Sequence, residues 1–214
     1  MPDRPRSRLN NVGASVRQRL LNLAHARGQP MELLLTRYAL ERLLHRLSLS
    51  PHRERFVLKG AMLLATWFDE PHRSTRDVDL LGFGDAAHEA PLATFCEIMA
   101  IEIDDGVSFD LKGLRIEAIR EEVEYGGSRL RTTAALAGAR IPITVDIGFG
   151  DAVEPGVEDI DLPDAAGHAG TPPARLFAGD GRGREVSCDG GLGHGQQSDE
   201  GLLRRLDADE RFRA

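Results

Sequence analysis

The chain has 214 residues, of which 41% are hydrophobic and 29% are charged. These are the proportions of an ordinary globular protein with one domain, or one domain and an appendage. The formal net charge of -7 argues against a general nucleic-acid-binding surface but allows a local basic patch. No apolar run approaches the length of about 18 residues that spans a membrane, and none follows the basic N-terminus, so we expect neither a membrane helix nor a signal peptide.

Two helices are expected first. Residues 12–27 and 30–47 both carry helical periodicity, and Pro30 suits the first turn of the second helix. One apolar stripe of that helix consists of Leu33, Leu40, Leu43, Leu44 and Leu47. The pair Ser50-Pro51 then ends the pattern.

A strand, a helix and a second strand are expected next. The stretch "RFVLKG" is typical of a short strand that ends at Gly60, and "AMLLATWF" is typical of a helix. After the polar run "DEPHRSTR", the stretch "DVDLLGF" indicates another strand, and residues 86–101 indicate another helix.

The rest of the chain changes character at Pro163. Before it, three β-rich stretches cover residues 114–122, 129–136 and 141–149, with glycine turns between them. After it, residues 164–214 contain ten glycines and no Ile, Tyr or Trp, and a regular period survives at most in "LLRRL". Such a segment cannot bury enough apolar surface to offset its ordering entropy, so we predict a disordered tail.

Three aspartates stand in or beside strands that are otherwise apolar. Asp77 and Asp79 are two residues apart, so they project from the same side of their strand. Asp146 interrupts the later strand "ITVDIGFGD". If the two strands are neighbours, the three carboxylates converge on a site for two Mg²⁺ ions, which prefer carboxylate and phosphate oxygens.

Upstream residues fit the phosphate side of such a site. Gly60 ends a strand and opens a helix, where free N–H groups favour a phosphate. Arg73 and Thr75 precede the aspartate pair and can reach triphosphate oxygens. A lone D-x-D usually lies in a surface loop or a helix cap, and Asp146 alone could be a solvated residue of an edge strand. The combination of the three aspartates with Gly60, Arg73 and Thr75 favours the two-metal site over these alternatives.

The chain resembles the AbiEii/AbiGii toxin family, within the nucleotidyltransferase superfamily that includes DNA polymerase β. The resemblance spans roughly residues 33–159 and rests on "FVLKGAMLL", "RSTRDVDLLGFGD" and "ITVDIGFGD". It implies that Asp77 and Asp79 hold the Mg²⁺ that carries a nucleoside triphosphate. Asp146 would bind the second ion or activate the acceptor hydroxyl.

The same resemblance assigns the nucleotide-binding segment. Gly60 would lie under the phosphates, with Arg73 and Thr75 steadying them. Ala61 departs from the family pattern, which usually has Gly or Ser there, although its N–H remains available. Lys59 matches the pattern without an assigned role.

Other uses of D-x-D fit less well. In haloacid-dehalogenase phosphatases the aspartates follow the apolar strand, whereas here they precede it. Sugar-nucleotide glycosyltransferases usually carry a preceding nucleotide-binding fold, which is missing here. The histidines show no paired ligand spacing, and only His72 lies beside the expected site. A degenerate, non-catalytic binding module remains an alternative.

The C-terminal motifs of the family are missing from the tail. The family continues with a Glu-Lys motif and an Arg-x-(Lys/Arg)-Asp-(Phe/Leu)-Tyr-Asp motif, neither of which occurs here. Permitted codons for the tail, read from the second base of each, allow a helical peptide containing "AEKF" and "RMKDFYD" in the expected order. We therefore interpret the tail as a slip of reading frame near residues 162–164; the alternative is a natural disordered extension.

The sequence thus predicts an α/β, polymerase β-like nucleotidyltransferase core: a mixed β-sheet with flanking helices. Its parts would be an N-terminal helical region at 1–55, the core at 56–163 and the aberrant tail at 164–214. The expected activity is Mg²⁺-dependent transfer of a nucleoside monophosphate to an RNA, such as tRNA, or to a protein hydroxyl, with a cognate antitoxin as partner. The alternative is a catalytically dead remnant. Cys96 and Cys188 have no metal-type spacing, which favours the reducing cytoplasm.

Overall fold

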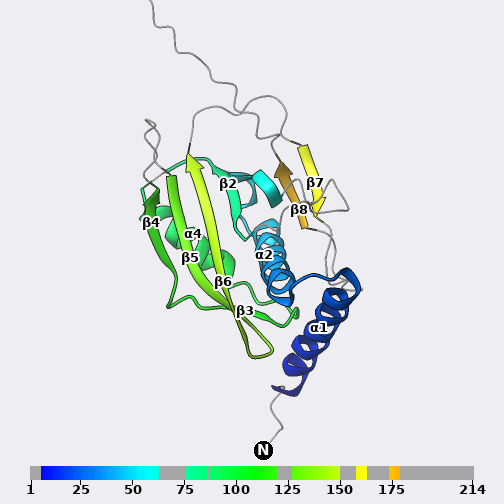
Figure 1. The fold of residues 1–214 in the computed structure, drawn as a ribbon. Helices are drawn as coiled ribbons and strands as arrows, with labels where there is room; N and C mark the ends of the chain where they lie inside the picture. Colours follow the sequence, from blue (N-terminus) through cyan, green and yellow to red (C-terminus); the bar gives the residue numbers. More distant parts are fainter. Residues whose placement is uncertain are drawn as a thin grey trace, which may run out of the picture. The chain divides into compact units, whose positions relative to one another are not determined.

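The computed structural model describes residues 6–62, 76–85, 87–119, 127–149, 158–162 and 174–178 (Figure 1). Contacts group the chain into two compact units, residues 1–181 and 182–214. All the described residues belong to the first unit, and the expected tail beyond residue 178 lies outside them.

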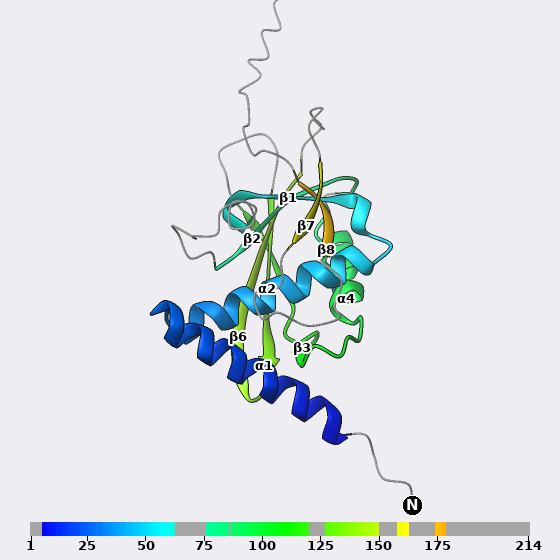
Figure 2. The ribbon, with the colours of Figure 1, turned by 90° about the vertical axis from the view of Figure 1, so that its right-hand side faces the viewer.

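The N-terminal helices form a hairpin (Figure 2). Helix α1 covers Arg6–Arg27 and α2 covers Met31–Leu49, which confirms both predicted helices. Gly28 joins them with φ of +61°, the left-handed conformation that commonly ends a helix. Pro30 is the residue just before α2 rather than part of its first turn.

The described strands form one mixed sheet. Their order is β3-β5-β6-β2-β1-β8-β7, and β4 also pairs with β5. The pairs β2–β6 and β1–β8 are parallel and the others are antiparallel. The elements that follow α2 are the short helix η1 (Arg53–Arg55), β1 (Phe56–Lys59), β2 (Val78–Gly82), α4 (Glu89–Met99), β3 (Val107–Phe109), β4 (Arg115–Ile119), β5 (Gly127–Leu136), β6 (Ala139–Phe149), β7 (Glu158–Leu162) and β8 (Ala174–Ala178). This architecture confirms the predicted α/β fold class.

One face of the sheet is the core face. Side chains alternate between buried and partly exposed along β2, β5 and β6, as expected when helices cover one side. The buried set includes Val78, Leu80, Leu130, Val145 and Ile147, which share one cluster with residues of α2 and α4. In Figure 1, α4 lies behind β5 and β6. The opposite face, which we call the open face, carries the alternate, partly exposed residues of these strands, including Asp79 and Asp146.

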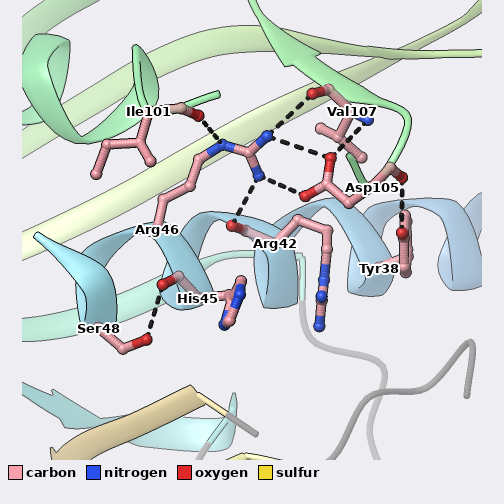
Figure 3. Close-up of polar contacts among 8 residues, drawn as sticks. All are labelled: Tyr38, Arg42, His45, Arg46, Ser48, Ile101, Asp105 and Val107. Carbon is pink, nitrogen blue, oxygen red and sulfur yellow. Dashed lines mark hydrogen bonds and ion pairs between the residues drawn. The ribbon is translucent and has the colours of Figure 1, made fainter. Parts of the chain in front are cut away.

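A buried arginine ties α2 to the loop before β3 (Figure 3). Arg46 donates to both carboxylate oxygens of Asp105, at 2.7 and 3.2 Å. It also donates to three carbonyl oxygens, those of Ile101, Arg42 and Val107. These five bonds match the five N–H groups of a guanidinium, so the buried charge is fully satisfied.

Strand β8 is a difference from the sequence prediction. Residues 174–178 lie in the segment expected to be disordered, yet they pair in parallel with β1 and antiparallel with β7. Leu176 and Ala178 are buried in the main core. A strand this short carries too few residues for a recognisable period, and burial by its neighbours stabilises it instead. In the described part of the chain, no helix is long and apolar enough to cross a membrane.

Candidate active site on the open face

Charged side chains stand in one row across neighbouring strands. Lys59 on β1 is paired with Asp79 on β2, Asp79 with Asp146 on β6, and Asp146 with Arg129 on β5, which is paired in turn with Glu117 on β4. Residues paired directly across neighbouring strands project from the same face of a sheet. The two aspartate strands are therefore neighbours in parallel register, which is the condition the sequence argument required.

The aspartates lie close enough to perturb one another. Asp77 is half-buried directly before β2, and Asp79 is half-buried on its second residue. Burial raises the pKa of Asp79 above its ordinary value, and the negative charges of Asp77 and Asp146 raise it further. The positive charges of Lys59 and Arg129 lower it without cancelling that effect. The three aspartates outnumber the two cations Lys59 and Arg129 that act on Asp79, so these five groups together have a negative formal charge.

Arg129 is a site residue that the sequence argument missed. Its Nε and Nη2 atoms donate to the two carboxylate oxygens of Asp146 at 2.7 and 2.6 Å, in a bidentate ion pair. Hydrogen bonding to Asp146 raises the pKa of Arg129 further above its already high value. An arginine on a strand gives no signal by itself; only the register of β5 against β6 identifies it.

Gly60 supports Asp79 through close packing. Its φ of +73° is the left-handed conformation, which side chains with a Cβ rarely adopt. A Cβ added to Gly60 would overlap Oδ2 of Asp79, so only glycine fits beneath the carboxylate. Residues 60–62 are helical, so Ala61 lies in the first turn of a helix beginning at the site, as predicted from the sequence.

Lys59 reaches across the open face. A Cβ added to Gly148 would lie 3.8 Å from Nζ of Lys59, so the ammonium group lies above β6, two residues along from Asp146. Its charge also acts on Asp79. Lys59 therefore has a position in the site, where the sequence argument could assign it no role.

The carboxylates suit a divalent cation as a set of oxygen donors. Among the described residues, no group of three or more His, Cys, Asp or Glu side chains is arranged to hold a metal ion. Arg129 donates to both carboxylate oxygens of Asp146. Burial and the negative charges of Asp77 and Asp146 raise the pKa of Asp79, and carboxylate oxygens are the ligands that Mg²⁺ prefers. Asp77 and Asp79 carry oxygen donors of the kind such an ion needs, whereas both oxygens of Asp146 are engaged by Arg129.

Two predicted phosphate contacts lie outside the described residues. These are Arg73 and Thr75, together with the neighbouring His72. The structure therefore brings together Lys59, Gly60, Asp77, Asp79 and Asp146 and adds Arg129.

The comparisons with known proteins give one match. We found no match among curated proteins and none among solved structures. The model of the family described as "Nucleotidyl transferase AbiEii toxin, Type IV TA system" matches residues 42–178, which is more than half of the chain and includes the whole charged row. The chain therefore belongs to the AbiEii nucleotidyl transferase toxin family of type IV toxin–antitoxin systems.

Proposed function

We propose that the protein transfers a nucleoside monophosphate from a nucleoside triphosphate to a hydroxyl group in a Mg²⁺-dependent reaction. The row of Lys59, Asp79, Asp146 and Arg129 supports this proposal, because it places two carboxylates between two cations on the open face. Such an arrangement suits a triphosphate: the carboxylates take its metal, and the cations take its phosphate oxygens.

Each residue of the site has a separate role in the proposed reaction. Asp77 and Asp79 hold the metal, which supplies charge neutralisation and orients the phosphates. Lys59 contacts phosphate oxygens from above β6, and the N–H groups at Gly60 and Ala61 lie beneath them. Asp146 orients the acceptor hydroxyl and takes its proton.

The proposed transfer is a single displacement at the α-phosphorus of the nucleoside triphosphate. The acceptor oxygen forms a bond to the α-phosphorus while the bond from that phosphorus to the bridging oxygen breaks. Pyrophosphate leaves with the electron pair of the broken bond. Arg129 fixes the direction of the Asp146 carboxylate through its bidentate ion pair.

Membership of this family also implies a partner protein. We propose that the chain acts as a toxin with a cognate antitoxin and that both proteins are cytoplasmic. The acceptor is an RNA such as tRNA, or a protein hydroxyl.

A transfer assay tests the proposal. Labelled nucleotide is offered with Mg²⁺ and cellular RNA or protein to the unaltered chain and to Asp79→Ala. The rate of label transfer should fall by about 100-fold or more, the order expected when one electrostatic contact to a transition state is lost. Asp85→Ala is the matched control, because this exposed carboxylate follows β2 and bonds only locally to the N–H of Ala87 among the described residues. Equal transfer by the unaltered chain and Asp79→Ala would exclude catalysis through this aspartate.

A catalytically dead remnant is the second candidate. The observation that favours it is the ion pair of Arg129 with Asp146, which occupies both oxygens of the third carboxylate. A remnant would still bind Mg²⁺ and nucleotide at Asp77 and Asp79. Calorimetric binding of the nucleotide without any label transfer would therefore identify this state.

The reading-frame interpretation adds a further test. We infer that the basic residue and last aspartate of the family motifs are encoded in the shifted frame beyond residues 162–164. Both the family match and β8 continue to residue 178, so a slip at 162–164 would replace the β8 peptide as well. Sequencing the gene across these codons is the measurement: an open shifted frame supports the slip, and an intact frame as printed overturns it.

A further inference from the structure

Arg129 lies between two carboxylates of the charged row. It is paired with Asp146 on β6 and, on its other side, with Glu117 on β4. Its Nε donates to Oδ1 of Asp146 at 2.7 Å, and its Nη2 donates to Oδ2 at 2.6 Å. Glu117 is more than half exposed, whereas the Asp146 side chain is 17% exposed, so solvent screens the pair with Asp146 less. The guanidinium of Arg129 is therefore bound to Asp146.

The positive charge of Arg129 is permanent. A guanidinium stays protonated at any physiological pH. The hydrogen bond to Asp146 and the negative charge of that residue raise the pKa of Arg129 further, and the charges of Asp77 and Glu117 add to this effect. Strand β6 lies between β5 and β2 in the sheet, so Arg129 and Asp79 are on opposite sides of Asp146. A fixed cation thus stands on the side of Asp146 that is away from Asp79.

A second divalent ion at Asp146 does not fit this arrangement. Such an ion would have to bind carboxylate oxygens that already accept two N–H groups of Arg129. Its charge would also stand beside the guanidinium, and like charges repel at short range. Asp79, on the other side of Asp146, and the neighbouring Asp77 carry oxygen donors for one ion. The donors therefore suit one Mg²⁺ better than the two that the sequence predicted.

We propose that the site holds a single Mg²⁺, at Asp77 and Asp79, and that the guanidinium of Arg129 takes the place of a second ion. The inference rests on the proposed nucleotidyl transfer and gives Arg129 a direct part in it. In a two-metal site the ions stabilise both the attacking and the leaving oxygen of the displacement. Here Arg129 supplies the positive charge on the side of the acceptor.

The pair with Asp146 leaves both partners free to act on substrate. A guanidinium has five N–H groups, and a carboxylate has about four lone-pair sites. Two of each are used in the bidentate pair. Asp146 therefore still accepts the proton of the acceptor hydroxyl, and further N–H groups of Arg129 donate to an oxygen of the transferred phosphate. The proton and the leaving pyrophosphate go where the proposed displacement sends them, and no further reactant is needed.

Counting bound metal tests the inference without any turnover. Mn²⁺ takes the place of Mg²⁺, because both suit carboxylate sites and Mn²⁺ is detected by electron paramagnetic resonance. The unaltered chain should bind one Mn²⁺, and Asp79→Ala should lose it. Arg129→Gln should bind two, because Asp146 is released and the repelling charge is gone. Spin coupling between the two ions should then broaden the spectrum, at the separation of roughly 4 Å that is typical of two-metal sites.

Arg131→Gln is the matched control. It removes the same charge two residues along β5, from a side chain that is 52% exposed and whose ion pair is with Glu117 instead of Asp146. This variant should still bind one Mn²⁺. Arg129→Lys, which keeps the charge, should also bind one. Two ions on the unaltered chain, or a single ion on Arg129→Gln, would overturn the inference. Thermal unfolding of each variant shows whether the fold is kept.

The rate of transfer gives a second measurement. Once all the nucleotide is complexed with Mg²⁺, additional free Mg²⁺ should not raise the rate of the unaltered chain, and a rate that keeps rising would count against a single ion. Arg129→Gln should be slower by about 100-fold, the order expected for one lost electrostatic contact. One bound Mn²⁺ without any transfer would overturn the proposed function and leave the count standing. Transfer with two bound ions would overturn the inference and leave the function standing.

Discussion

Asp79 is a carboxylate whose ionisation opposes folding. Burial and the charges of Asp77 and Asp146 raise its pKa in the folded chain. A carboxyl group with a raised pKa binds its proton more tightly when folded, so its favourable contribution is complete below the unfolded pKa of about 4. That contribution is lost as the pH rises through the raised pKa. At neutral pH the ionised Asp79 therefore lowers the free energy of unfolding, as expected of a carboxylate positioned to bind a cation.

Asp79→Asn should consequently stabilise the metal-free protein at neutral pH. The gain should stay below about 1 kcal/mol, because Asp79 is partly exposed and solvent screens its charge. This corresponds to a rise of no more than a few degrees in Tm for a chain of this size. Thermal unfolding in EDTA should show the difference at neutral pH and none below about pH 4. Asp85→Asn, which alters an exposed carboxylate, should change nothing, and a lower Tm for Asp79→Asn at neutral pH would contradict the argument.

Sequence reasoning located the aspartates but not all of their neighbours. Asp77, Asp79 and Gly60 stand out because carboxylates and glycine interrupt apolar runs of period two. Arg129 and Gly148 do not, because an arginine or glycine in a strand is common. Their place in the site follows from the pairing of β5 with β6 and from the position of the Lys59 ammonium group. Neither can be recognised from a local sequence pattern.

In α2, too, the sequence pattern predicted the element but not which of its polar residues would be buried. Its leucine stripe predicted α2 from sequence, but the structure buries every residue from Tyr38 to Leu47, including Arg46. A polar residue in a helix is expected on the solvent side, and only the loop before β3 shows why Arg46 is inside. Asp105, which closes that loop, is itself 1% exposed.

Arg46→Met should be severely destabilising. Removing the guanidinium leaves Asp105 as a buried charge with its main cation gone, at a cost of about 3–5 kcal/mol. Chemical denaturation should show this loss as a lower midpoint. Arg131→Gln is the matched control, since its exposed pair with Glu117 is worth at most about 1 kcal/mol. The double change Arg46→Met/Asp105→Leu should recover much of the loss; no recovery would mean that the unpaired carboxylate is not its cause.

At the scale of the molecule, most of the strands were predictable from the sequence. The sequence indicated the strands around residues 56–60 and 77–83, the stretch 114–122 that contains β4, and the long β5 and β6. It missed β3, β7 and β8. These strands pair with neighbours that are distant in the sequence or joined by irregular segments, so their existence depends on the whole sheet.

The predicted boundary at residue 163 can be tested against β8. A chain ending at Pro163 would lose Leu176 and Ala178, which are 1% and 3% exposed, and would leave β1 without its parallel partner. It would also lose the contact of Arg53 with the ring of Phe177, at 4.9 Å. Deleting one buried leucine side chain alone costs about 2–5 kcal/mol, so the shortened chain should unfold at least about 5 °C lower.

A chain ending at Gly181 is the matched control, because residues 1–181 form one compact unit. It should unfold at the temperature of the full chain, whereas Leu176→Ala in the full chain should reproduce much of the loss caused by ending at Pro163. This pattern would mean that the core of the fold includes β8. Equal unfolding temperatures for the chains ending at Pro163 and Gly181 would mean instead that β8 adds nothing to stability, and that the nucleotidyl transferase core ends where the apolar pattern of the sequence ends.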